Sequence, residues 1–104
     1  MGRIDSYIKG WLVGDFTPSL FTSKDIEVGV KYYVSGDYED RHVHKLTVEY
    51  TLVLSGKVRM NNIEYGAKDI VTILPGVSTD FQCLEDAITL VIKTPSLPKD
   101  KHPA

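Results

Sequence analysis

The sequence lacks long apolar runs, paired cysteines and an N-terminal secretory pattern. No run of about eighteen apolar residues occurs, so a membrane-spanning helix is not expected. The single cysteine, Cys83, has no partner for an internal disulfide. The opening segment MGRIDSYIKG has no apolar core of the kind that directs secretion. Together these absences lead us to expect a cytoplasmic protein.

An excess of one charge is also missing. Lysine and arginine number 12 and aspartate and glutamate 14, which gives a formal net charge of −2, and both signs are spread along the chain. A protein that binds a nucleic acid or an anionic membrane through electrostatic attraction needs a strong basic field. We therefore expect neither of these partners.

Convincing amphipathic helices are absent as well, and short β-type segments take their place. These segments are rich in Val, Ile, Thr, Tyr and Leu. Turn residues separate them, as at Gly36–Asp37, Ser55–Gly56, Asn61–Asn62 and Glu85–Asp86. With 104 residues, of which 42% are apolar, the pattern predicts one all-β sandwich or barrel domain over residues 1–104. The proline-containing segment 95–104 is predicted to run off the domain as a surface tail.

Strand parity places three polar residues on inward faces. Side chains alternate along a strand, so His42 and His44 point the same way, and Glu49 shares a face with Thr51 and Val53. An ionised glutamate buried without a partner costs several kcal/mol or takes up a proton. We therefore expect a cation beside Glu49.

The other face of the Glu49 strand is apolar and needs a cover. Leu52 and Leu54 point outward if Glu49 points inward. The N-terminal segment, about residues 1–24, is predicted to pack on the barrel or on a partner and to cover this face through Trp11 and Phe16. The other possible cover is a second copy of the chain, because large exposed apolar patches mark interfaces. A homodimer is the natural inference.

The polar residues fall in a pattern that resembles the first motif of the cupin superfamily. Gly36, His42, His44, Glu49 and Gly56 follow one another with five, one, four and six residues between them. The segment YGAKDIVTILPG resembles the second cupin motif, with its glycine–aspartate turn and its later Pro–Gly pair. The resemblance implies a small single-domain, all-β protein with a cupin-like jelly-roll β-barrel of the RmlC-like kind.

The resemblance also implies a metal site, from which this chain departs at one position. In metal-binding cupins the two histidines and the glutamate of the first motif, with a histidine from the second, hold a divalent ion. His42, His44 and Glu49 are the expected ligands here. Thr79 occupies the expected position of the missing histidine. Asp80 is the alternative candidate ligand, and its side chain would face the cavity only if a β-bulge shifted the strand register by one residue.

Three protein ligands can suffice for a metal. Two imidazoles and one carboxylate suit Fe, Mn, Ni, Zn or Co and leave coordination positions open for water or substrate. Thr79 is a weak neutral donor, so we expect it to hydrogen-bond a metal-bound water rather than to ligate the ion. The alternative is a metal-free barrel in which protonated His42 or His44 pairs with Glu49.

The predicted cavity would hold a small polar or acidic metabolite. Thr79, Phe81 and Tyr32 are its expected walls, with Tyr32 facing inward if Lys31 faces outward. Cupins include both enzymes and binding proteins, so the resemblance leaves catalysis open. An enzyme of this kind would be dioxygenase-like or isomerase-like, using oxygen chemistry or polarisation of a carbonyl. The alternatives are a non-catalytic ligand-binding or sensing barrel and an assembly protein that uses its apolar face.

Overall fold

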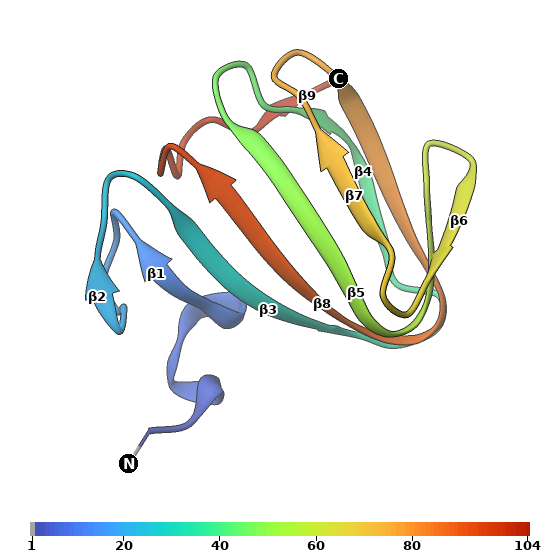
Figure 1. Ribbon diagram of the computed structural model, residues 1–104, viewed down its shortest axis with the longest axis horizontal. Coiled ribbons are helices and arrows are strands. Elements are labelled where there is room, and N and C mark those ends of the chain that lie inside the picture. Colours follow the sequence, from blue (N-terminus) through green and yellow to red (C-terminus); the bar gives the residue numbers. More distant parts are fainter. Residues whose placement is uncertain (1) are drawn as a thin grey trace.

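Residues 2–104, which the computed structural model describes, form nine strands and two short 3₁₀ turns (Figure 1). The turns are η1 (Ile4–Ser6) and η2 (Ile8–Gly10). The strands are β1 (Trp11–Gly14), β2 (Phe21–Thr22), β3 (Glu27–Tyr33), β4 (Tyr38–Val43), β5 (Val48–Met60), β6 (Ile63–Gly66), β7 (Ile70–Ile73), β8 (Ser78–Thr94) and β9 (His102–Pro103). No helix among these residues has the length and apolar character needed to cross a bilayer.

The strands form one curled sheet whose main path is β2-β1-β3-β8-β4-β9. β5 pairs with β8 over most of its length and also with β6 and β7. Because β8 has partners along two edges, the sheet folds back on itself, with β4 and β9 behind β5 and β7 in Figure 1. The predicted all-β jelly-roll barrel is confirmed.

The two longest strands continue through two predicted turns. β5 passes Ser55–Gly56 and β8 passes Glu85–Asp86 without interruption. The β5–β8 register shifts three times between Val53 and Val58, so the strands bend there and keep their pairing. Gly56 has φ of 84°, and a Cβ added to it would lie 2.1 Å from the Asp86 carbonyl oxygen. The expected chain reversals are therefore bulges at which continuous strands bend round the barrel.

Alternate residues of β3, β5 and β8 face the barrel interior. An apolar core fills part of it and includes the single cysteine, which is 1% exposed. The core consists of Val53, Val58, Met60, Ile73, Phe81, Cys83 and Ala87. The rest of the interior is open and more polar.

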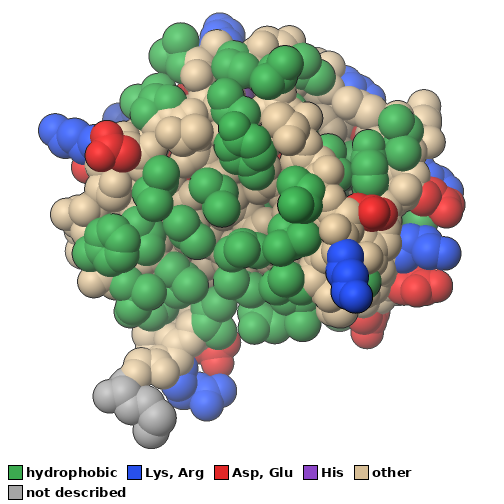
Figure 2. All heavy atoms as spheres, in the orientation of Figure 1, with side chains coloured by type: hydrophobic (Ala, Val, Ile, Leu, Met, Phe, Trp, Pro, Cys, Tyr) green, Lys and Arg blue, Asp and Glu red, His purple; other side chains and the backbone are tan. Residues whose placement is uncertain are grey.

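The outer face of the β3–β8–β5–β7 sheet is apolar. Cross-strand pairing aligns Val30, Leu90, Leu52 and Ile70 in one row, with Ile70 64% exposed. Figure 2 shows apolar side chains gathered where these strands lie in Figure 1, with charged side chains mostly towards the rim. The outward orientation predicted for Leu52 and Leu54 is confirmed. We call this surface the apolar sheet face; its outward side chains are Val28, Val30, Tyr32, Tyr50, Leu52, Leu54, Ile70, Ile88, Leu90 and Ile92.

The N-terminal segment packs on the barrel but leaves the apolar sheet face open. β1 extends the sheet beside β3, and the indole of Trp11 lies over Gly29. A Cβ at Gly29 would come within 2.7 Å of the indole Cε3 atom, so the missing side chain makes the room for the ring. Trp11 and Phe16 line the barrel cavity. The prediction that they cover Leu52 and Leu54 is wrong, because Gly29 places the indole on the inner side of the sheet.

The C-terminal segment 95–104 closes one end of the cavity instead of running off as a tail. β9 pairs with β4, and the Asp100 carboxylate is buried. That carboxylate accepts hydrogen bonds from the backbone N–H groups of residues 45–47 at 3.0, 2.8 and 3.0 Å. His102, which is half-buried, lies with Nε2 3.2 Å from the same carboxylate. Charge-assisted bonds of this kind are strong, so the segment is fixed to the barrel.

Candidate functional site

A cavity of about 400 Å³ occupies the open part of the barrel interior. Strands β3, β4, β5 and β8 supply most of its wall. Trp11 and Phe16 close one side, and Leu97, Asp100 and Lys101 close another. A volume of this size lies within the range of small-molecule sites.

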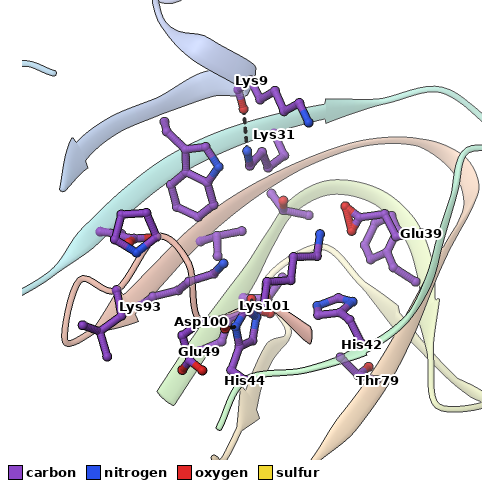
Figure 3. Close-up of a pocket in the computed structure, with 18 of the residues that line it drawn as sticks. Lys9, Lys31, Glu39, His42, His44, Glu49, Thr79, Lys93, Asp100 and Lys101 are labelled. Carbon is purple, nitrogen blue, oxygen red and sulfur yellow. Dashed lines mark hydrogen bonds and ion pairs between the residues drawn. The ribbon is translucent and has the colours of Figure 1, made fainter. Parts of the chain in front are cut away.

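The three predicted metal ligands all line this cavity (Figure 3). His42 lies in β4, His44 directly follows that strand, and Glu49 lies in β5. All three side chains are buried. Nε2 of His44 is 3.6 Å from Oε1 of Glu49, and the two imidazole centroids are 5.2 Å apart. Strand alternation therefore brings the three residues together as their parity predicts.

Backbone carbonyls orient both imidazoles. Nδ1 of His42 lies 3.1 Å from the Asp40 carbonyl oxygen, and Nδ1 of His44 bonds to the carbonyl oxygen of Asp100. A carbonyl oxygen only accepts, so each Nδ1 carries a proton, and in the neutral form of each ring Nε2 is the atom with the free lone pair. Burial lowers the pKa of His42 and favours its neutral form. Protons held at Nδ1 by carbonyl groups are the usual arrangement around metal-binding histidines.

Glu49 is held in its ionised form. Burial raises the pKa of its carboxyl group, but the neighbouring His44, Lys93 and the Thr51 hydroxyl outweigh burial and leave the pKa below its ordinary value. The Thr51 hydroxyl donates to Oε2 at 3.1 Å, while Oε1 faces His44. A buried carboxylate oxygen is therefore directed at the open nitrogen of His44.

The donor set fits a divalent cation. Within residues 2–104 no three His, Cys, Asp or Glu side chains come close enough, as they stand, to enclose an ion. Yet Nε2 of His44 is buried and has no hydrogen-bond partner. It faces Glu49 Oε1 at 3.6 Å, beyond hydrogen-bond length. A neutral His44 would turn a lone pair towards the ionised carboxylate, which is costly unless a proton or a cation lies between the two atoms.

Thr79 and Asp80 both line the cavity, but the Asp80 carboxylate is bound by groups on neighbouring segments. Thr79 is the cross-strand partner of His42 and is buried, and its hydroxyl donates to the Asp80 carbonyl oxygen at 2.9 Å. The Asp80 carboxylate accepts from the Asn61 N–H at 2.9 Å and lies 3.6 Å from the Arg41 guanidinium. The β4–β8 register shifts between Glu39 and His42, where β4 carries one extra residue, but β8 alternates without interruption, so Thr79 occupies the inward position.

The aromatic wall consists of Phe81 and Tyr33, not Tyr32. The Tyr33 and Phe81 ring centroids are 4.4 Å apart, and the Tyr33 hydroxyl donates to Glu39 at 3.3 Å. Tyr32 is 63% exposed on the apolar sheet face. The prediction that Tyr32 lines the cavity is wrong because it assumed that Lys31 points outward, whereas Lys31 lies on the cavity wall.

Four lysines that the sequence reasoning did not single out also line the cavity: Lys9, Lys31, Lys93 and Lys101 (Figure 3). Lys31 and Lys93 hold their ammonium groups 4.1 and 4.9 Å from the centre of the Trp11 ring. The segment EVGVKYYV shows which residues share a face with Lys31, but it does not show that this face is the interior. Lys31 shares parity with Glu27 and Gly29, and the opposite parity is entirely apolar.

Comparison with known proteins identifies the fold but not the function. No protein-family model and no curated protein matches the sequence. Solved structures do match, at identities that establish the fold alone. They include DMSP lyase DddQ from Ruegeria pomeroyi, at 20% identity and a TM-score of 0.75 over 90% of this chain and 49% of that one.

Two further structures agree with this fold. An RmlC-like cupin from Shewanella frigidimarina has 18% identity and a TM-score of 0.66 over 73% of this chain and 70% of that one. Oxalate decarboxylase from Bacillus subtilis, a protein with Mn(II) centres, has 17% identity and a TM-score of 0.68 over 78% of this chain. The match spans about half of DddQ and 24% of the decarboxylase. The chain thus has the fold of the cupins, as its motifs predict.

Proposed function

We propose that this protein binds a divalent transition metal through His42, His44 and Glu49, and that the metal and cavity together bind a small polar or acidic metabolite. The observation that carries the proposal is the buried Nε2 of His44, which has no hydrogen-bond partner and faces an ionised Glu49 oxygen at 3.6 Å. Thr79, Phe81 and Tyr33 would contact the metabolite, since all three line the cavity.

Manganese is one of five candidate ions, with iron, nickel, zinc and cobalt. The ligand types suit all five. The Mn(II) centres of the similarly folded oxalate decarboxylase support manganese as the first ion to test. An ion in this position supplies Lewis-acid polarisation of a bound carbonyl or, for a redox-active metal, oxygen chemistry. The chain itself holds the ligand through the cavity wall, of which His42, His44, Glu49, Thr79 and Phe81 are buried.

Elemental analysis tests the proposal directly. Protein purified without an affinity tag or added metal should carry a stoichiometric transition ion. Calorimetric titration of metal-free protein with Mn(II) should then show saturable binding, weakened at least about tenfold by Glu49→Gln, which removes one charged ligand. Glu64→Gln is the matched control, because Glu64 is exposed and pairs with Arg59. Wild-type protein that binds no transition metal in either experiment contradicts the proposal.

A second candidate is a metal-free ligand-binding barrel. It is favoured by the same 3.6 Å separation, which is an ion-pair distance if His44 is protonated, and by the incomplete convergence of the three ligands. This protein would be non-catalytic and would bind its ligand through the cavity wall. Normal folding and ligand binding in rigorously metal-free protein, together with no metal uptake, would establish it.

We also propose that the protein is a homodimer formed through the apolar sheet face. The cross-strand rows of this face carry no charged side chain, so one copy can lie against another without burying an unpaired charge. A twofold axis through such a surface pairs like with like and needs no second kind of surface. Burying side chains such as Leu54 and Ile70, which are 47% and 64% exposed, supplies the free energy.

A further inference from the structure

The lysines of the cavity wall form no salt bridge with a carboxylate among residues 2–104. Each salt bridge formed by residues 2–104 uses an arginine or a histidine as its cation. The carboxylates nearest the lysines have other partners. Glu27 accepts from the Ser96 hydroxyl at 3.0 Å, and Glu39 accepts from Tyr33 at 3.3 Å. The lysines therefore lack a direct ion-pair partner, although Glu27, Glu39 and Glu49 line the same cavity.

Trp11 gathers two of these lysines at one place. Its indole lies over Gly29, and the ammonium groups of Lys31 and Lys93 approach the ring at 4.1 and 4.9 Å. The Lys31 ammonium also donates to the Lys9 carbonyl oxygen. The ring attracts both cations, and the carbonyl oxygen fixes one of them. Two like charges are thereby held in position on one wall.

The same lysines connect this wall to the candidate metal centre. Lys93 pairs in the sheet register with Glu27 on one side and with Glu49 on the other. Lys101 lines the same cavity as His42 and Lys31. Figure 3 shows Lys101 reaching across the cavity between Lys31 and His42. A ligand bound at the three candidate metal ligands would extend towards these ammonium groups.

A buried hydroxyl beside Lys31 also lacks a partner. Thr89 is the cross-strand neighbour of Lys31, lines the cavity and is 1% exposed. Its Oγ1 atom has no hydrogen-bond partner among the described residues. A buried hydroxyl without a partner costs free energy, so the position favours a polar ligand group.

We propose that Lys31, Lys93 and Lys101, with the Thr89 hydroxyl, form the binding site for a carboxylate group of a small organic anion. The proposal rests on the proposed function, because it assigns one end of the ligand that the cavity would hold. No arginine is among the described residues that line the cavity. Lysine ammonium groups and a hydroxyl suit a carboxylate, whereas phosphate sites often use an arginine fork or a backbone nest.

The lowered pKa of Lys31 is what an anion-binding site without its anion would show. Burial lowers the pKa of Lys31 to about 8; Glu39 opposes the shift, and Lys93, Lys9 and Lys101 add to it. A bound carboxylate would supply the missing opposite charge and raise this pKa again. Anion binding should therefore be strongest below about pH 8 and weaken above it, as Lys31 loses its proton.

Malonate is the probe for this site, and malonamide is its neutral counterpart. Trp11 is the only tryptophan of the chain, so its fluorescence reports on the site. Metal should be removed with a solid chelating resin, because soluble chelators are themselves carboxylates. Malonate should produce a saturable change in Trp11 fluorescence at pH 7. Malonamide and phosphate should each bind at least about tenfold more weakly. Equal binding of malonamide or phosphate would overturn the assignment to a carboxylate.

Lysine variants test whether malonate binding depends on these particular side chains or only on the overall positive charge of the protein. Lys31→Met and Lys101→Met should each weaken malonate binding about tenfold in a calorimetric titration. Lys101→Met leaves the lysines beside Trp11 in place, so it tests the site even if Lys31→Met disturbs the indole. Lys24→Met removes the same charge from an exposed position and should have no effect. Lysine variants that bind malonate as tightly as this control would overturn the proposal.

Failure of the carboxylate-site proposal can be told apart from failure of the metal proposal. His42→Ala with His44→Ala should abolish Mn(II) binding, whereas the carboxylate site is measured by malonate titration of metal-free wild-type protein, in which no metal contributes. Malonate binding without any metal uptake would leave the anion site standing and remove the metal. Metal uptake without a preference for malonate over malonamide would support the metal site and contradict the carboxylate site.

Discussion

Nε2 of His44 lies 3.6 Å from Oε1 of Glu49, and Nδ1 of the same ring is bonded to the Asp100 carbonyl oxygen. The imidazole is thus fixed by its far nitrogen, while the near nitrogen and a carboxylate oxygen face each other. Most of the apolar core lies outside this group of residues. The ligands should therefore contribute less to folding than to binding.

The double variant His42→Ala with His44→Ala tests this separation. We expect it to lose metal binding and to remain folded, with a free energy of unfolding lower by about 2 kcal/mol because each imidazole gives up one hydrogen bond. Circular dichroism and urea denaturation in metal-free buffer provide the measurement. Global unfolding of the variant would show that the histidines are structural.

Thr79→His should strengthen metal binding. Thr79 is the cross-strand partner of His42 on the cavity wall, so an imidazole there supplies a fourth ligand. We expect at least a tenfold lower dissociation constant, about 1.4 kcal/mol, measured by competition with a chelator. Asp80→His is the matched control and should change little, because the Asp80 carboxylate is engaged with Arg41 and Asn61. Tighter binding by the Asp80 variant alone would mean that the register is wrong.

The assembly prediction concerns the centre of the apolar sheet face. Multi-angle light scattering at tens of micromolar should give about twice the 11.6 kDa chain mass. Leu52→Glu should give a folded monomer, because a dimer would bury its charge without a partner. Ile63→Glu is the control, since Ile63 is equally apolar and 55% exposed but lies on β6. A wild-type monomer would refute the prediction.

Asp100→Asn should loosen the C-terminal segment. The carboxylate accepts three backbone N–H bonds from residues 45–47, and a neutral amide forms weaker ones. We expect a loss of about 2 kcal/mol in the free energy of unfolding and faster amide exchange in residues 45–47. Asp86→Asn serves as the control, because Asp86 is exposed. Unchanged exchange would mean that the segment is held by other contacts.

Lys31 should make the protein more stable as the pH rises above neutrality. Burial lowers the pKa of Lys31 from 10.5 to about 8, so between these values the unfolded chain binds more protons than the folded one. The free energy of unfolding should therefore increase from pH 8 towards pH 10, by about 1 kcal/mol, since solvent screens this half-buried group. Lys31→Met should abolish the increase; an equal slope in both proteins would assign it to another group.

The sequence by itself determined the all-β class, the shared face of His42 and His44, the shared face of Glu49 and Thr51, and the β5–β6 turn. The alternation of side chains along a strand and the preference of Gly, Asn and Asp for turns are local properties, so both can be read from neighbouring residues. Asn61 and Asn62 form that turn with φ of 50° and 66°, as their identity predicts.

Only the tertiary structure decided which face of β3 is inside. Local polarity suggested that Lys31 points to solvent and Tyr32 inward, and the reverse is true. The ordinary rule of apolar inside and polar outside fails here because the barrel interior holds a polar cavity, while the outer face of the same sheet is apolar. Trp11 packs over Gly29, and residues 95–104 close one end of the cavity. Both arrangements depend on contacts between segments that are far apart in the sequence, and no local pattern specifies such contacts.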